Sequence, residues 1–169
     1  MASSLQHFVD WLANTPASQT IKEIGWIIPT VQTIHILAIA AVVGSMVLLD
    51  LRVLGLAARA QSLSSVSERL IPWVWRALVV LLLTGIVMVT GEPGRSLVNS
   101  IFQIKMALVI IAAVLTFFLQ RSLRAKGAAA DTAPMDAKAI AALSLVTWVL
   151  IVFAGRWIAY GDTLFGSGS

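Results

Sequence analysis

Four long apolar segments constrain this chain more than any other feature of its sequence. They cover about residues 26–49, 71–90, 98–119 and 140–160. Each has about 20 residues, the length that an α-helix needs to cross a hydrocarbon core of about 30 Å. In lipid, only helices and closed barrels satisfy every backbone polar group. The sequence therefore predicts an all-α integral membrane protein in which the four segments form a four-helix bundle.

Composition agrees with this class and excludes others. Of the 169 residues, 59% are hydrophobic and only 12% are charged, whereas a soluble domain is about half apolar and a quarter charged. The net charge of +4 does not indicate nucleic-acid binding, because the basic residues lie in short loops beside the apolar segments. The lack of cysteine excludes disulfides, thiolate metal sites and cysteine nucleophiles. We expect residues 1–169 to form a single transmembrane domain in a lipid bilayer.

A short amphipathic segment precedes the first span. Between residues 3 and 14, apolar Leu5, Phe8 and Leu12 alternate at helical spacing with polar side chains. Trp11 in the same segment is a typical interfacial anchor. This pattern predicts an N-terminal helix that lies on the membrane surface.

Lysine and arginine in the loops predict the orientation. The loops after the first and third spans are the more basic, and the opposite side carries only Lys22 and Arg95. By the positive-inside rule both termini lie outside, which is the periplasm for a bacterial inner-membrane protein. Asp50 and Arg52, where the first span ends, are expected to pair at the membrane interface. The basic residues of the inner loops are Arg52, Arg59, Arg69, Arg121, Arg124, Lys126 and Lys138.

The sequence contains a weak internal repeat. A shift of 70 residues places His35 on Lys105 and Thr84-Gly85 on Ala154-Gly155, and it superposes span one on three and two on four. Internal repeats in membrane proteins place sites at the repeat interface. Two parallel repeated hairpins are one interpretation, and chance similarity in a sequence of few residue types is the other.

Three ionisable residues lie inside the apolar segments, all in the outer half. His35 is in the first span, Lys105 in the third and Arg156 in the fourth. A charge at such a depth costs about 3 kcal/mol or more, so an ionisable residue there marks a functional site by default. Glu92 is the nearest carboxylate, and Met88 lies one helical turn before it. The sequence therefore predicts one site formed by these side chains.

Haem explains this set of residues with a single ligand. A neutral histidine in a dry helical bundle is a common axial ligand of haem iron, so His35 is the predicted metal ligand. Lys105 and Arg156 would bind the haem propionates, and Glu92 would be their counter-ion. We therefore expect a b-type haem.

Two further side chains complete the predicted cofactor site. A low-spin b-type haem usually has two buried histidines, and the spans supply only one. The sixth ligand would be Met88, Met46, water or nothing. Trp148 lies on the same face of the fourth span as Arg156 and would form an apolar floor or a stacking surface.

Each of these residues also has a purely structural interpretation. A lone buried histidine such as His35 often hydrogen-bonds a neighbouring helix. Lys105 could extend its ammonium to the outer surface. Arg156 and Glu92 could form a structural ion pair, and methionines usually fill the core. These alternatives stay open at the level of the sequence.

Three stretches carry a family resemblance: WIIPTVQTIHILAIAAVVGSMVLLDLRVLGL, GEPGRSLVNSIFQIK and TWVLIVFAGRWIAY. They resemble an uncharacterised family of small four-helix bacterial inner-membrane proteins. The chain is more faintly similar to the HemJ type of protoporphyrinogen oxidase and to CopD-like copper proteins. In HemJ-like proteins a histidine in the first span and a lysine in the third belong to a haem site, a placement that His35 and Lys105 match. The WMAGL-type sequence that follows that histidine is absent here, so the resemblance implies haem binding more than oxidase activity.

Three classes of function follow from these observations. The first is a haem-binding, redox-active membrane protein that exchanges electrons with quinone or a periplasmic partner. The second is a membrane transport or binding protein for a small anion, a quinone or a metal such as copper. The third is a structural subunit of a larger membrane complex. Small residues in the first span, Ala38, Ala41 and Gly44, favour close helix contacts and a homo-oligomer.

Overall fold

A computed structural model describes residues 2–58, 60–125 and 133–164 of the chain. Within these ranges all regular structure is helical, which confirms the predicted all-α class. The helices are α1 (Ala2–Ala13), α2 (Pro16–Glu23), α3 (Ile27–Val53), α4 (Leu63–Gly91), α5 (Pro93–Leu97), α6 (Ser100–Ala125) and α7 (Met135–Leu164).

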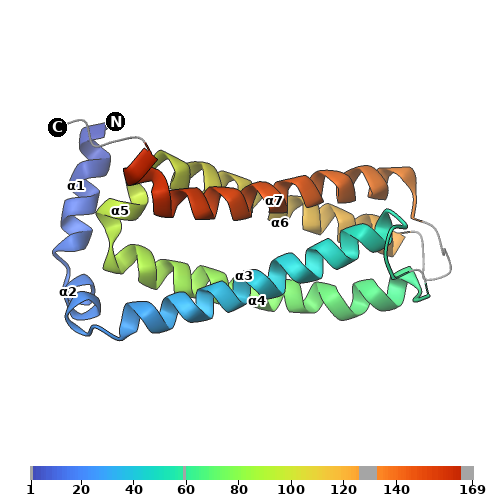
Figure 1. Cartoon of the computed structure of the whole chain (residues 1–169), viewed down its shortest axis with the longest axis horizontal. Coiled ribbons are helices and arrows are strands. Elements are labelled where there is room, and N and C mark those ends of the chain that lie inside the picture. Colours follow the sequence, from blue (N-terminus) through green and yellow to red (C-terminus); the bar gives the residue numbers. More distant parts are fainter. Residues whose placement is uncertain (1, 59, 126–132, 165–169) are drawn as a thin grey trace.

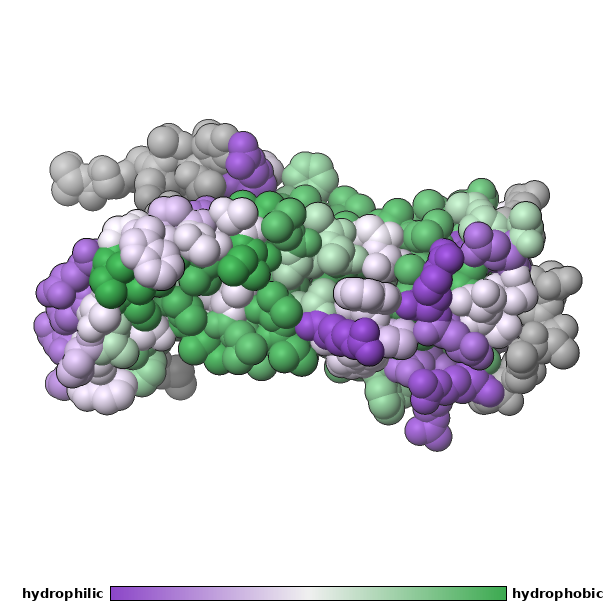
Figure 2. Space-filling view, turned by 90° about the horizontal axis from the view of Figure 1, so that it is seen from below, coloured by the Kyte–Doolittle hydropathy of each residue, from purple (hydrophilic) through white to green (hydrophobic). Residues whose placement is uncertain are grey.

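Helices α3, α4, α6 and α7 are long and apolar enough to cross a membrane. Most of their side chains point outward, and large apolar ones such as Leu82, Ile86 and Ile110 are more than half exposed. On the face that Figure 2 shows, hydrophobic residues cover a broad area, with hydrophilic residues on either side of it along the bundle. Such a surface is stable only against lipid, so the fold is that of a multi-pass membrane protein.

The four long helices extend beyond the apolar segments. Helix α4 begins at Leu63 rather than near residue 71, because the Ser62 side chain caps its first turn by accepting from the Ser65 amide at 3.3 Å. Pro72 lies inside this helix without ending it. In α4, hydropathy therefore marks the apolar part of the helix, whereas a capping residue sets where the helix begins.

The bundle consists of two antiparallel hairpins, α3–α4 and α6–α7 (Figure 1). Helix α3 packs on α4 and α7, and α6 packs mainly on α7. The helices α3 and α6 lie diagonally opposite, but their side chains meet where the Thr116 hydroxyl lies 3.9 Å from the Met46 sulfur. The core therefore lies between the hairpins.

The 70-residue repeat reappears in the burial pattern. Positions that the shift superposes are buried in both hairpins, and Met46 and Thr116, which form one such pair, contact each other. A contact between equivalent positions is what a pseudo-two-fold relation between the hairpins would give, but the helix contacts are unequal, since α3 packs on α7 more extensively than α6 packs on α4. The pairs are Val42 and Ala112, Met46 and Thr116, Leu49 and Leu119, Leu63 and Ala133, Ser67 and Ala137, Ile71 and Ala141, Val74 and Ser144, and Ala77 and Thr147.

Helices α1, α2 and α5 lie across one end of the bundle, which we call the outer end (Figure 1). The inner end carries the connection from α3 to α4. Helix α1 coincides with the amphipathic helix predicted over residues 3–14, whereas α2 and α5 were not expected. Helix α2 packs so closely on α4 that a Cβ at Gly91 would lie 2.9 Å from the Ile21 side chain and 2.8 Å from that of Ile28. The lack of a side chain at Gly91 therefore allows the Ile21 and Ile28 side chains to pack against α4.

Candidate functional site

His35 is hydrogen-bonded across the first hairpin. Its Nδ1 lies 2.7 Å from the Thr84 Oγ1, and the side chain is half-buried between α3 and α4. The Thr84 hydroxyl donates to the Val80 carbonyl at 2.7 Å, a bond within α4. A hydroxyl has a single hydrogen, so Thr84 must accept from His35. The proton of the neutral imidazole is therefore on Nδ1, and Nε2 carries the lone pair.

This tautomer determines what His35 can do. A neutral imidazole with its proton on Nδ1 can accept a hydrogen bond at Nε2 or ligate a metal there. Histidines that ligate metals almost always donate their other N–H to a fixed acceptor, which sets the orientation of the ring. Thr84 occupies this supporting position. The His35 hydrogen bond is thus both a helix-to-helix contact and the support that a ligand would need.

Lys105 has a counterpart environment in the second hairpin. A Cβ built at Gly155 would lie 3.8 Å from the Lys105 Nζ and Cε, and one at Gly85 would lie 3.8 Å from the His35 Cε1. The imidazole and the ammonium therefore each rest beside a glycine of the partner helix in their own hairpin. The repeat that superposes these residues in sequence also superposes their surroundings.

The two side chains face a common region in the outer half of the bundle. Lys105 is half-buried on α6, and its ammonium is close enough to the His35 ring to act on it electrostatically. Among the described residues, no side chain forms a hydrogen bond or ion pair with this ammonium. His35 thus offers a lone pair at Nε2, which could bind a metal ion or accept a proton or a hydrogen bond. Lys105 offers a positive charge, which could bind an anionic group of the same ligand.

The other predicted site residues are less closely associated with this pair. Arg156 is exposed on α7, directly after Gly155. Glu92 is exposed between α4 and α5. Met88 is half-buried one turn beyond Thr84 on α4. The structure therefore brings His35 and Lys105 within electrostatic reach of each other, and Arg156 follows Gly155, the glycine beside which the Lys105 ammonium lies.

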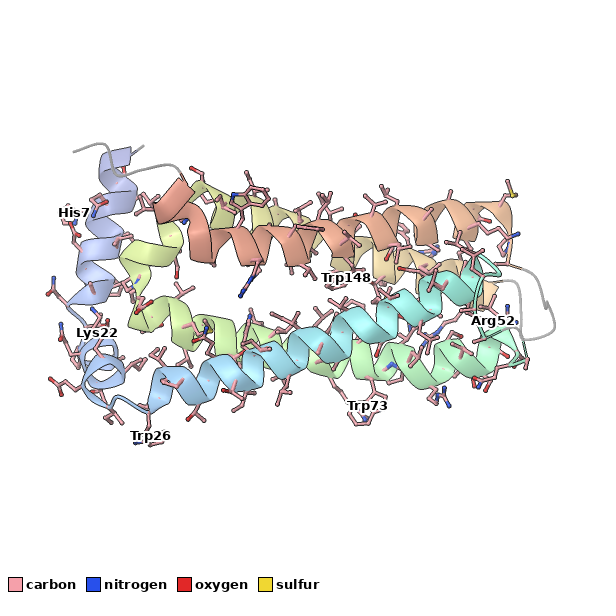
Figure 3. All side chains as sticks on the ribbon, in the orientation of Figure 1. His7, Lys22, Trp26, Arg52, Trp73 and Trp148 are labelled. Carbon is pink, nitrogen blue, oxygen red and sulfur yellow. The ribbon has the colours of Figure 1, made fainter. Side chains whose placement is uncertain are left out.

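Trp148 lies inward of Arg156 on α7, within the core of the bundle. Its side chain is only 2% exposed and belongs to the hydrophobic core between the hairpins, about two turns from Gly155 (Figure 3). Its Nε1 has no hydrogen-bond partner among the described residues. Thr84, in contrast, had no predicted role, although the repeat had already singled out the Thr84-Gly85 pair.

A second group of polar side chains is buried near the inner end. Asp50 on α3 and Ser144 on α7 are 0% exposed. The expected pairing of Asp50 with Arg52 is wrong, because the Arg52 Nε and Nη2 donate to the Gln61 carbonyl at 2.9 and 2.7 Å. Neither carboxyl oxygen of Asp50 has a hydrogen-bond partner among the described residues. Hydropathy treats this position as the end of a span and gives no sign that it faces the core.

The described part of the chain contains no group of three or more histidine, cysteine, aspartate or glutamate residues that could hold a metal ion. A copper ion bound by such side chains alone would need such a group. Haem brings four nitrogen ligands of its own, and one histidine suffices to anchor it. The single histidine of this site could therefore serve as an axial ligand of haem.

Comparison with known proteins gives one match. A family model described as a family of unknown function, DUF6644, matches residues 8–161. No curated protein and no solved structure matches the chain.

Proposed function

The chain belongs to the DUF6644 family of unknown function, and we propose that it is a membrane protein that binds a b-type haem through His35. The observation that carries this proposal is the hydrogen bond from the His35 Nδ1 to Thr84, because it leaves Nε2 as the ligating atom. Haem would supply one-electron redox chemistry, and the protein would supply the axial ligand and its orientation.

The cation opposite His35 supports the same ligand. A half-buried ammonium without a partner is costly, and an anionic group on the ligand would offset that cost. The Lys105 side chain beside Gly155 would bind a propionate. Arg156 and Glu92, exposed at the same end, would contact propionates that reach the membrane surface. The placement of His35 and Lys105 in the first and third spans is also that of HemJ-like haem sites.

The proposal includes a location and partners. The basic loops lie at the inner end, so the protein would sit in a bacterial inner membrane with both termini in the periplasm. The haem would then lie near the periplasmic surface, where it could exchange electrons with a quinone or a periplasmic protein. Exposed apolar faces on α4, α6 and α7 would also allow a homo-oligomer.

A spectroscopic titration tests the haem proposal. Protein purified in detergent is titrated with haemin, and binding is followed by the shift and sharpening of the Soret band. The wild type should bind one haem per chain, and His35→Ala should lose binding while its far-ultraviolet circular dichroism stays helical. His7→Ala is the matched control, because His7 is exposed on α1 away from the bundle core and should have no effect (Figure 3).

The alternatives give different results in the same titration. Wild-type protein that leaves the Soret band of free haemin unchanged would contradict the proposal. Equal binding by His35→Ala and wild type would show that His35 is not the ligand. Loss of binding in Lys105→Ala with no loss in His35→Ala would instead indicate a pocket for an anion or a quinone.

A further inference from the structure

The buried side chains of Asp50 and Ser144 have no role in the proposed haem site, and Trp148, the predicted apolar floor of that site, lies one turn from Ser144. Asp50 lies 15 residues from His35 on α3, which is about 22 Å along the helix. Ser144 and Trp148 lie one turn apart on α7 and so occupy the same face of that helix. This inner polar cluster, as we name these three side chains, lies where α3 packs on α7.

The cluster leaves several strong hydrogen-bonding atoms without partners among the described residues. They include both carboxyl oxygens of Asp50, the Ser144 hydroxyl and the Trp148 Nε1. The Ser144 hydroxyl is close enough to act on the Asp50 carboxyl group, although no hydrogen bond of ordinary geometry joins them. An ionised carboxylate with so little stabilisation would be very costly in this core, and such a group binds a proton instead.

Among the described residues, no charged side chain hydrogen-bonds to the Asp50 carboxyl group, and Arg121 and Arg124 on α6 are exposed. Arg52, the nearest cation in sequence, donates to the Gln61 carbonyl. Lys22 and Glu23 on α2 lie at the other end of α3, and the Asp136 carboxylate accepts from Ser122. The charged residues on α4 and at the start of α7 are Glu68, Arg69, Arg76 and Asp136, all exposed, and Lys138, which is half-buried.

We propose that Asp50 is a buried proton-binding site, held as a neutral carboxylic acid that exchanges its proton with the inner end of the bundle. The neutral acid can donate its O–H to the Ser144 hydroxyl or accept a hydrogen bond from it, whereas a carboxylate can only accept. The ionised form would also carry the large cost of an unpaired charge in this core. The exchange route is short, since α3 ends at Val53, about 4.5 Å further along the helix. This site is independent of haem binding, because it lies at the opposite end of α3.

Infrared spectroscopy tests the proposal directly. The chain has eight aspartate and glutamate residues, and Asp10, Glu23, Glu68, Glu92 and Asp136 are exposed. Exposed carboxyl groups are ionised at neutral pH. Protein in a detergent without carbonyl groups should therefore show a carboxylic-acid C=O band at pH 7 that Asp50→Asn removes. Glu68→Gln, at an exposed position near the same end, is the matched control and should leave the band unchanged.

Two further results decide the proposal. Ser144→Ala removes the hydroxyl that the neutral acid would use as its hydrogen-bond partner, so the band should move to higher frequency while its intensity stays the same. This variant also serves if Asp50→Asn does not fold. The proposal is overturned if the folded wild type has no such band at pH 7, if the band persists in folded Asp50→Asn, or if Ser144→Ala leaves its frequency unchanged.

Discussion

The α3–α4 hairpin carries an imidazole where the α6–α7 hairpin carries an ammonium, although both groups rest beside a glycine of the partner helix. The residue directly before each of these glycines differs as well. Thr84 gives His35 a hydrogen-bond acceptor, whereas the equivalent residue in the second hairpin is Ala154, which offers Lys105 no hydroxyl. The hairpins thus share several buried positions and differ in the polar groups that they present to the region between them.

This difference indicates how a repeated fold can acquire a site. Apolar positions such as Leu49 and Leu119 keep equivalent burial, so either hairpin can be held by the same contacts. The polar positions are free to diverge because they contribute little to this packing. An asymmetric ligand with a metal centre and an anionic group requires such divergence, since two identical hairpins would offer it two identical ends.

The largest expected effect comes from exchanging the two polar residues. The double variant His35→Lys with Lys105→His should lose haem binding by more than about 100-fold, because the new imidazole has no acceptor for its N–H. Adding Ala154→Thr supplies that acceptor and should restore a substantial part of the affinity. Soret titration of the double and triple variants measures both steps. Equal affinity in the double variant and the wild type would show that the threonine has no supporting role.

A smaller effect is expected when only the supporting hydrogen bond is removed. Thr84→Val keeps the shape of the side chain but removes the acceptor of the His35 Nδ1 proton, so haem affinity should fall about 10- to 100-fold. Thr90→Val is the matched control, because the Thr90 hydroxyl donates to the Ile86 carbonyl within the same helix at 2.8 Å. Similar affinities for the two variants would contradict the assigned tautomer.

Sequence alone predicted the framework of this comparison but not its polar contacts. Four apolar segments of spanning length define four transmembrane helices, and a shift of 70 residues identifies the equivalent positions. The His35–Thr84 contact joins residues 49 positions apart, and it depends on the register between α3 and α4. Hydropathy carries no information on that register. The repeat therefore drew attention to Thr84, but the sequence did not show that Thr84 is the hydrogen-bond partner of His35.

The inner polar cluster was missed for a related reason. Asp50 follows an apolar run and precedes a basic residue, a pattern typical of the membrane interface. Its burial depends on how α3 crosses α7, a contact between helices that are distant in the sequence. Helices α2 and α5 were also missed, because their short and mixed sequences have no apolar periodicity long enough to indicate a helix.

Removing the charge in the second hairpin should have a milder effect on binding. Lys105→Met keeps the length and the apolar stem but loses the ammonium, and the haem iron retains its ligand. A charge-assisted hydrogen bond contributes about 1.5 to 3 kcal/mol. Because Lys105 is only half-buried, we expect the low end, a loss of about 10-fold in affinity. An affinity equal to that of the wild type would exclude a propionate contact, and complete loss would favour an anion pocket over haem.

The smallest effect concerns the packing that the hairpins share. Leu49 and Leu119 are equivalent in the repeat, and each is 0% exposed in the core. Truncating either one leaves a cavity of similar size in an equivalent place, at a cost of about 2 to 5 kcal/mol. If the hairpins are equivalent in packing, Leu49→Ala and Leu119→Ala should differ in unfolding free energy by less than about 1 kcal/mol. Unfolding in mixed micelles, followed by circular dichroism, measures this difference. A much larger loss of unfolding free energy in one variant would show that one hairpin contributes more to the stability of the core. The 70-residue repeat would then relate the positions of the residues but not their contributions to stability.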